Sequence, residues 1–186
     1  MLKDKNVKFI YLIILLIGIL ICIINVGYKK YISIVDIIKV ENFLLNNKSE
    51  YIGVLEIKKI NLKKGFYSID NINNNVNKSI EILKKSEMPN IQNGTLIMAA
   101  HSGNGQVSHF KNLYKLVKGD IINIFYKNKK YQYKLINIYE IDKTGIIKLD
   151  KENNFTNLIL ITCSKKKDNK QIVYESRLIK VFDRKI

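Results

Sequence analysis

An uncharged apolar run near the amino terminus constrains the fold more than any other feature. Residues 9–26 read FIYLIILLIGILICIINV, eighteen residues without a charged side chain. As a helix this run is about 27 Å long, enough to cross the hydrocarbon core of a bilayer. Lysines lie on both sides of it, so the positive-inside rule gives only a small preference for a cytoplasmic amino terminus.

A cleaved signal peptide is the competing interpretation of this run. The run is longer than a usual signal-peptide core, and no small-x-small cleavage site follows it. We therefore expect residues 1–27 to form a cytoplasmic tip and a single-pass membrane anchor, with the remainder outside the cell. A signal peptide would give a secreted protein with an unchanged soluble domain.

The sequence after residue 27 predicts a short stalk followed by one mainly β domain. Apolar residues recur at nearly helical spacing within 28–50, which favours a helical stalk. Residues 51–186 are expected to form a closed β-barrel with short helices, since many short strands indicate a barrel or sandwich. The expected strands are 51–60, 65–69, 95–100, 121–126, 131–141, 158–163 and 171–182. A Lys-Asn-Lys-Lys turn predicts a hairpin over 121–141, and helical turns are expected at 77–84 and 107–116.

The formal net charge of +16 raises the question of nucleic-acid binding. Nearly all of this charge is lysine, spread among Asn and Ile along the whole chain, and no basic helix or arginine-aromatic cluster occurs. Base and phosphate recognition favours the bidentate fork of arginine. We therefore expect no nucleic-acid partner, and attraction to anionic polymers or membrane surfaces instead.

Two residues that carry chemistry end apolar strands. Cys163 follows the run Leu158–Thr162 and is the only cysteine outside the apolar anchor, where Cys22 lies. His101 follows the run Thr95–Ala100 and precedes a glycine-containing turn. Strand ends that face loops are where rigid scaffolds usually present reactive groups.

The third candidate is Arg177, inside a strand-like run whose alternate faces are both largely apolar. A cysteine, a histidine and an arginine together suit acyl transfer. Cys163 would be the nucleophile, His101 the general acid and base, and Arg177 the group that stabilises the oxyanion. Taken singly, Cys163 could be a buried structural thiol, His101 an ordinary strand-end histidine, and Arg177 a paired structural charge.

These residues resemble the sortase family. Residues 159–163 (ILITC) resemble the Thr-Leu-x-Thr-Cys strand of sortases, 99–101 (AAH) their Gly-His element, and 176–178 (SRL) the arginine strand that follows. The order His, Cys, Arg and the fourteen residues from Cys163 to Arg177 also fit. Residues 51–60 resemble the opening strand of the barrel, and 110–120 the segment after the histidine, so the resemblance covers about residues 51–182.

The resemblance implies a membrane-anchored cysteine transpeptidase. Such an enzyme would cleave a Leu-Pro-x-Thr-Gly-like sorting signal on a surface protein and hold the fragment as a thioester on Cys163. It would pass the fragment to an amine of a peptidoglycan precursor or a pilin. The chemistry requires no cofactor or metal, and the sequence shows no His, Cys and carboxylate cluster at ligand spacing.

Departures from the family pattern concern the subclass. Ile159, Ala100 and Ser102 stand where the family often has other residues, and we expect neither a lid before the barrel nor a second anchor. The segment 141–157 also lacks the long helical insertion of another subclass. Ser102 and Thr162 could orient the site through their hydroxyl groups, whereas His109 is expected to be a surface or packing residue.

Two other classes of function remain open. A membrane-tethered cysteine hydrolase would use the same thiol and histidine but pass the acyl group to water. A non-catalytic module that binds anionic wall polymers would not need Cys163, and its binding would weaken steeply with salt.

Overall fold

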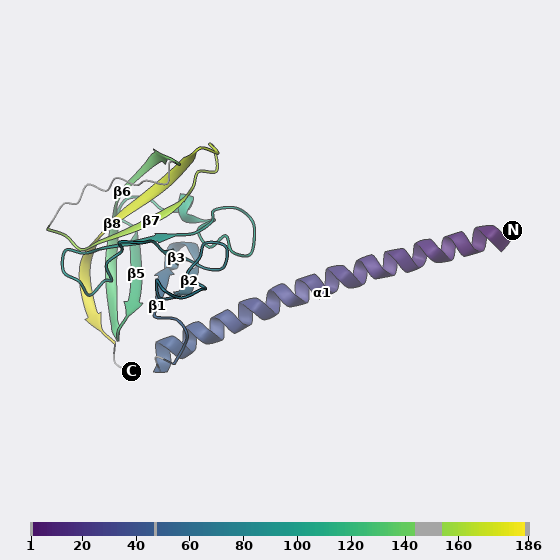
Figure 1. The fold of residues 1–186 in the computed structure, drawn as a ribbon, viewed down its shortest axis with the longest axis horizontal. Helices are drawn as coiled ribbons and strands as arrows, with labels where there is room; N and C mark the ends of the chain where they lie inside the picture. Colours follow the sequence, from purple (N-terminus) through teal and green to yellow (C-terminus); the bar gives the residue numbers. More distant parts are fainter. Residues whose placement is uncertain (1, 47, 144–153, 185–186) are drawn as a thin grey trace. The chain divides into compact units, whose positions relative to one another are not determined.

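The computed structural model describes residues 2–46, 48–143 and 154–184. The chain divides into two compact units, Met1–Ile37 and Ile38–Ile186, which are described separately. Helix α1 extends over Leu2–Asn46 (Figure 1). It is long and apolar enough to cross a membrane by length and composition, with a mean hydropathy of 3.1 in its most apolar window. Side chains such as Phe9, Leu16 and Ile23 are more than half exposed, and a helix that is apolar on every face needs apolar surroundings.

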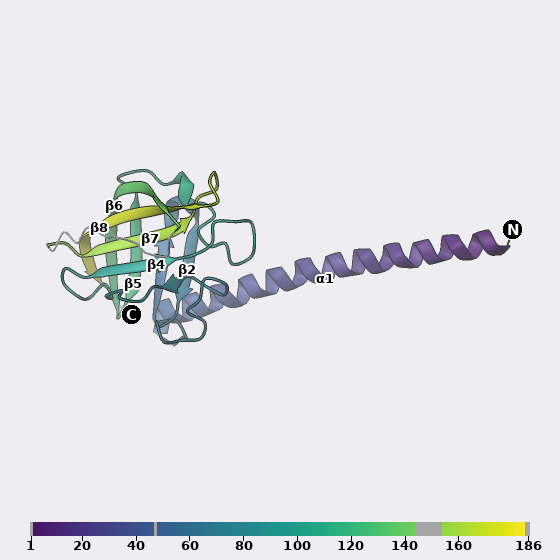
Figure 2. The ribbon, with the colours of Figure 1, turned by 45° about the horizontal axis from the view of Figure 1, so that its top comes forward.

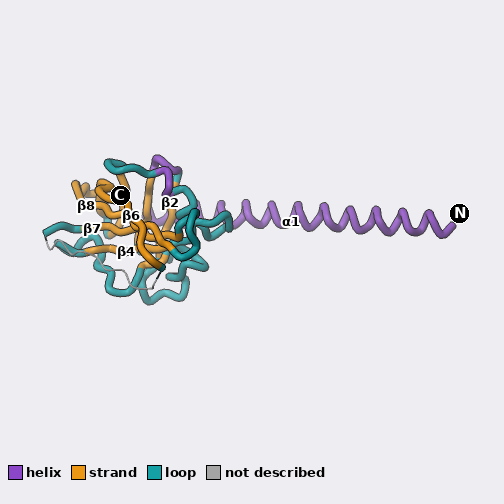
Figure 3. Tube along the Cα trace, turned by 90° about the horizontal axis from the view of Figure 1, so that it is seen from above, coloured by secondary structure: helices purple, strands orange, loops and turns teal. Residues whose placement is uncertain are grey.

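The second unit is built around one eight-stranded sheet. Its strands are β1 Gly53–Ile57, β2 Leu62–Phe66, β3 Glu81–Ile82, β4 Thr95–Ala99, β5 Ile121–Tyr126, β6 Lys129–Asp142, β7 Asn157–Cys163 and β8 Lys170–Asp183. They follow the order β2-β1-β5-β6-β8-β7-β4-β3, and Figure 2 shows β6, β8, β7 and β4 succeeding one another across the sheet. The sheet curves into a nearly closed barrel with β2 and β3 as its edges. Outside α1 the described chain consists almost entirely of strands and loops (Figure 3).

Successive side chains along each strand point alternately to the barrel interior and to its outer face. The interior core includes Leu96 and Met98 of β4, Leu158 and Leu160 of β7, and Tyr174 of β8, each at most 2 % exposed. A second apolar cluster, centred on Ile159, Ile161 and Val173, lies on the outer face of the same strands. Strands buried on both faces read as continuous apolar runs, which is why β7 shows no alternation in sequence.

The predicted hairpin over 121–141 is confirmed. Strands β5 and β6 pair from Ile121 opposite Lys134 to Tyr126 opposite Lys129. Lys127 and Asn128 form the turn with φ of 45° and 59°, the left-handed conformations that a tight two-residue turn requires. The remaining two lysines of the predicted turn already belong to β6.

Other local predictions were wrong in detail. The expected strand 51–60 ends at Ile57, and a 3₁₀ turn at Lys58–Ile60 with left-handed Asn61 reverses the chain into β2. The segment 77–84 contains turns and β3, where Asn74 Oδ1 accepts from Ile82 N at 2.7 Å. Asparagine side chains that bond to nearby backbone compete with helix formation in this way. In 107–116 only Leu113–Lys115 is helical, as a 3₁₀ turn.

The last turn of α1 belongs to the barrel unit. Val40 and Phe43 are buried against Tyr51, Val54 and Tyr67. Arg184, which follows β8, donates from Nη2 to the carbonyl oxygens of Phe43 and Leu44. A cation that bonds the last carbonyls of a helix stabilises its carboxyl end, so this arginine ties the end of the chain to the end of α1.

Candidate active site

The carboxyl ends of β4 and β7 lie side by side. Residues 95–99 pair in parallel with residues 157–161, and the pairing continues past β4 because Ala100 N donates to Ile161 O at 3.3 Å. His101 follows Ala100, and Cys163 stands two residues after Ile161. Neighbouring strands are about 4.8 Å apart. The structure therefore brings together two of the three residues that the sequence singles out.

Two hydroxyl groups tie these strand ends to each other. Thr162 Oγ1 donates to Ala100 O at 2.8 Å, and Ser102 Oγ donates to Cys163 O at 2.8 Å. Both hydroxyl-bearing residues are buried. A buried hydrogen bond holds its partners in one geometry because breaking it leaves a polar group unsatisfied. These bonds fix the backbone of the residues that carry the thiol and the imidazole.

His101 has a partner that sequence reasoning missed. Its Nε2 lies 3.0 Å from Asn77 Oδ1, within hydrogen-bonding distance. Asn77 is held by its own backbone N–H, which donates to Asn75 Oδ1 at 2.8 Å. The only sequence signal was the density of asparagine in residues 71–77, which does not indicate which strand end that loop reaches.

Cys163 is a free, half-buried thiol. Side chains alternate between the two faces of a strand, and Cys163 stands two residues after Ile161 and four after Ile159. Its side chain therefore lies on the outer face of β7 with theirs. The loop after it is closed by Ser164 N, which donates to Lys170 O at 2.9 Å. The short loop makes β7 and β8 a hairpin and determines which residue of β8 faces the thiol.

The register of this hairpin separates Arg177 from Cys163, contrary to the sequence expectation. Cys163 pairs with Gln171, whereas Arg177 pairs with Asn157 at the opposite end of β7. Six strand residues correspond to about 20 Å, too far for any side chain to bridge. The guanidinium instead stacks over the ring of Phe155, 4.2 Å from its centroid. The structure therefore places Arg177 away from the thiol.

Comparison with known proteins assigns the sheet domain to a family. The family model described as "Sortase domain" matches residues 55–183, most of the chain. The chain belongs to the sortase family. Sortases are transpeptidases, and the matched residues of this sortase include both strand ends described above.

Solved sortase structures share the fold. Sortase C of Streptococcus pneumoniae matches with a TM-score of 0.64 and 20 % identity, covering 74 % of this chain and 72 % of that one. Sortase A of Listeria monocytogenes matches with a TM-score of 0.60 and 18 % identity, covering 74 % and 92 %. Sortase D5 of Clostridium perfringens matches with a TM-score of 0.56 and 22 % identity, covering 70 % and 79 %. A search of curated proteins found no match. The similar structures come from several sortase subclasses and leave the subclass of this chain unassigned.

The segment expected to lack a helical insertion lies mostly outside the described residues. It covers 141–157, of which 144–153 are not described. The adjoining described residues belong to β6 and to the start of β7.

A cavity of about 410 Å³ opens beside Cys163 in this sortase. Its apolar wall includes Phe110, Leu116 and Tyr174, and burial raises the pKa of the Tyr174 hydroxyl to about 12. The rim carries Lys111, Lys165 and Lys166 together with Glu140. The cavity is large enough for part of a second substrate next to the thiol.

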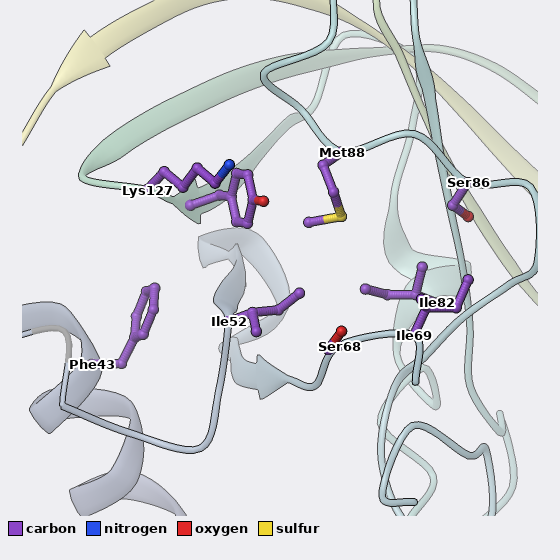
Figure 4. A pocket seen from close by; sticks show the side chains of 9 residues that line it. Phe43, Ile52, Ser68, Ile69, Ile82, Ser86, Met88 and Lys127 are labelled. Atoms are coloured by element: carbon purple, nitrogen blue, oxygen red, sulfur yellow. The ribbon is translucent and has the colours of Figure 1, made fainter. Parts of the chain in front are cut away.

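A second groove, of about 480 Å³, is largely apolar, and its wall contains neither a cysteine nor a histidine (Figure 4). It is lined by Phe43, Ile52, Ser68, Ile69, Ile82, Ser86, Met88, Tyr126 and Lys127. None of these residues belongs to β7 or β8. The groove is therefore separate from the strand ends that carry His101 and Cys163.

His109 occupies a different setting from His101. It lies in a turn, and its backbone N–H donates to Val107 O at 2.9 Å. It does not end a strand next to β7. Among residues 2–46, 48–143 and 154–184, no three His, Cys, Asp or Glu side chains gather as metal ligands would.

Proposed function

We propose that this sortase cleaves a Leu-Pro-x-Thr-Gly-like sorting signal, holds the fragment as a thioester on Cys163, and transfers it to an amine. The observation that carries the proposal is the adjoining position of His101 and Cys163 at the ends of the parallel strands β4 and β7. A thiol with an imidazole at the next strand end is the arrangement that nucleophilic acyl transfer requires.

The first half-reaction would break the signal peptide. The Cys163 sulfur bonds to the threonine carbonyl carbon while the carbonyl electrons move to oxygen. Collapse of this oxyanion breaks the carbon–nitrogen bond to glycine, and His101 gives a proton to the leaving amine. The Asn77 contact holds the imidazole in one orientation during this transfer.

The second half-reaction would form the new amide. The nitrogen of the acceptor amine bonds to the thioester carbon, its proton passes to His101, and the Cys163 thiolate leaves. One amide bond replaces another, so no oxidant or cofactor is needed. The cavity beside Cys163 gives an acceptor a route to the thioester.

The partners follow from the same chemistry. The donor would be a surface protein with a sorting signal, and the acceptor an amine of a peptidoglycan precursor or a pilin. Helix α1 would anchor the enzyme in the cell membrane as a single span, with the barrel outside the cell. The apolar, all-round exposed side chains of residues 9–26 support this anchoring.

Product analysis separates this proposal from a hydrolase. The full chain in detergent is incubated with a signal peptide, with and without an excess of an amine acceptor, and Cys163→Ala serves as the control. We expect a peptide–amine conjugate that increases with amine concentration and is absent in the variant. A product ending in free threonine at every amine concentration would instead establish hydrolysis.

A further inference from the structure

The oxyanion of the proposed reaction needs a hydrogen-bond donor, and Arg177 is too distant to supply it. We propose that Gln171 fills this role, with its side-chain amide donating to the oxyanion that forms when Cys163 attacks a carbonyl. This inference rests on the proposed function for its natural substrate, but the donor role applies to any acyl group that reaches Cys163. A side-chain amide is an established oxyanion donor in enzymes.

Register places Gln171 next to the thiol. Cys163 and Gln171 are direct partners in the antiparallel β7–β8 ladder. Directly opposed residues present their side chains on the same face, with Cβ atoms about 4.5–5.5 Å apart. An extended glutamine side chain covers most of this separation, and the Cys163 sulfur and the bound carbonyl extend toward it from the other strand, so its amide can reach an oxygen bonded to the carbon that Cys163 attacks.

The rest of this face gives the Gln171 amide little other use. Its partner on β6 is Ile141, and the next outer-face residue along β8 is Val173. Ile161 precedes Cys163 on the same face of β7. Gln171 is partly exposed, so water can satisfy its amide in the free enzyme, and a substrate oxygen at the Cys163 end would replace that water as the partner.

Among the described residues, three other donors near Cys163 have partners elsewhere. Ser164 N donates to Lys170 O, and the Lys165 ammonium lies over the Tyr114 ring, 4.5 Å from its centroid. Lys167 pairs with Glu140 at 2.9 Å. Lys166 lines the cavity beside Cys163 and is the rival donor that an experiment must exclude.

A neutral donor has a specific chemical consequence. The amide stabilises the oxyanion of acyl transfer, whereas alkylation of a thiol passes through a transition state without an oxyanion. Loss of Gln171 should therefore slow acylation and leave alkylation unchanged. A merely structural role would slow both reactions together, because both require an accessible, correctly held thiol.

The test compares two reactions of Cys163 in the full chain. p-Nitrophenyl acetate acylates the sulfur and expels p-nitrophenolate, and iodoacetamide alkylates the same sulfur with loss of iodide. Both rates are measured by mass spectrometry of the peptide that contains Cys163, so that Cys22 does not contribute. The variants are Gln171→Met, Lys166→Met and Arg177→Met, with Gln171→Arg to restore a donor.

We expect Gln171→Met to slow acylation roughly 100-fold, the usual effect of removing one oxyanion donor. Its alkylation rate, and both rates in Lys166→Met and Arg177→Met, should match the parent chain, and Gln171→Arg should recover acylation. Unchanged acylation in Gln171→Met, an equal fall of both rates, or a loss confined to Lys166→Met would overturn the inference. Because the ester needs no signal peptide, failure of every sorting peptide would reject the substrate proposal without affecting this result.

Discussion

The two ends of strand β7 present different chemistry on the same sheet. At its carboxyl end, Cys163 lies beside His101 and opposite Gln171. At its amino end, Asn157 lies opposite Arg177, whose guanidinium stacks on Phe155. A thiol, an imidazole and an amide lie at the carboxyl end of β7, whereas a cation lies against an aromatic ring at its amino end.

The difference follows from strand direction and loop length. β4 and β7 are parallel, so their carboxyl ends, with the residues that leave the sheet there, meet at one edge. The tight β7–β8 connection then brings the first residue after Lys170 opposite Cys163. Arg177 lies six residues further along β8, opposite the amino end of β7. Reactivity in this barrel is therefore expected at one end of β7 only.

The largest effect is expected when the imidazole is removed from the carboxyl end of β7. His101→Ala should lower kcat/KM for peptide transfer by roughly 1,000-fold, because general acid and base catalysis typically contributes on this scale. His109→Ala is the matched control and should retain most turnover, since His109 does not end a strand beside Cys163. The reverse pattern would reject the assignment of His101.

A smaller loss is expected when the imidazole keeps its place but loses its orienting contact. Asn77→Ala should lower kcat by about tenfold with little change in KM, since the Asn77 oxygen positions His101 and need not bind the peptide. Asn77→Asp retains an oxygen acceptor and should recover part of the rate. Equal effects of the two substitutions, or a change confined to KM, would contradict a positioning role.

The hydroxyl ties across the strand ends should contribute more to stability than to rate. Thr162→Val removes the buried bond to Ala100 O and should lower the free energy of unfolding by about 1 kcal/mol. Urea unfolding of the full chain in detergent measures this change, and turnover should fall only a few-fold. Loss of turnover as large as that of His101→Ala would mean that Thr162 acts in the chemistry.

The smallest effect is expected at the amino end of β7. Arg177→Met should leave kcat/KM unchanged and lower the free energy of unfolding by about 0.5–1 kcal/mol, the scale of one cation–π contact near the surface. Peptide transfer and urea unfolding measure the two quantities. A large fall in kcat/KM with unchanged stability would show that Arg177 takes part in the reaction, contrary to this prediction.

The features predicted from the sequence are those with a local signal. An apolar run followed by a polar loop marks a strand end, which is why the ends at His101 and Cys163 were predictable. The β5–β6 hairpin was predictable because a short polar turn joins two strand-like runs. The central position of Arg177's strand, between β6 and β7, also followed from its apolar faces.

The features that sequence could not provide depend on register and on loops distant in sequence. A spacing of fourteen residues is compatible with Arg177 facing Cys163 if the connection is long, and incompatible if it is short. Only the observed pairing with Gln171 decides this. Asn77 approaches His101 from a loop twenty-four residues earlier, and no local pattern encodes that contact.

Covalent capture of a sorting peptide tests most directly whether Cys163 is the nucleophile. The full chain is mixed with a Leu-Pro-x-Thr-Gly peptide without an added amine, quenched with acid, and the modified residue is located by tandem mass spectrometry. We expect one acyl group on Cys163, formed with release of the glycine fragment, removed by added amine, and absent in Cys163→Ala. An adduct that persists in Cys163→Ala, or no adduct with any signal peptide while p-nitrophenyl acetate still acylates Cys163, would contradict it.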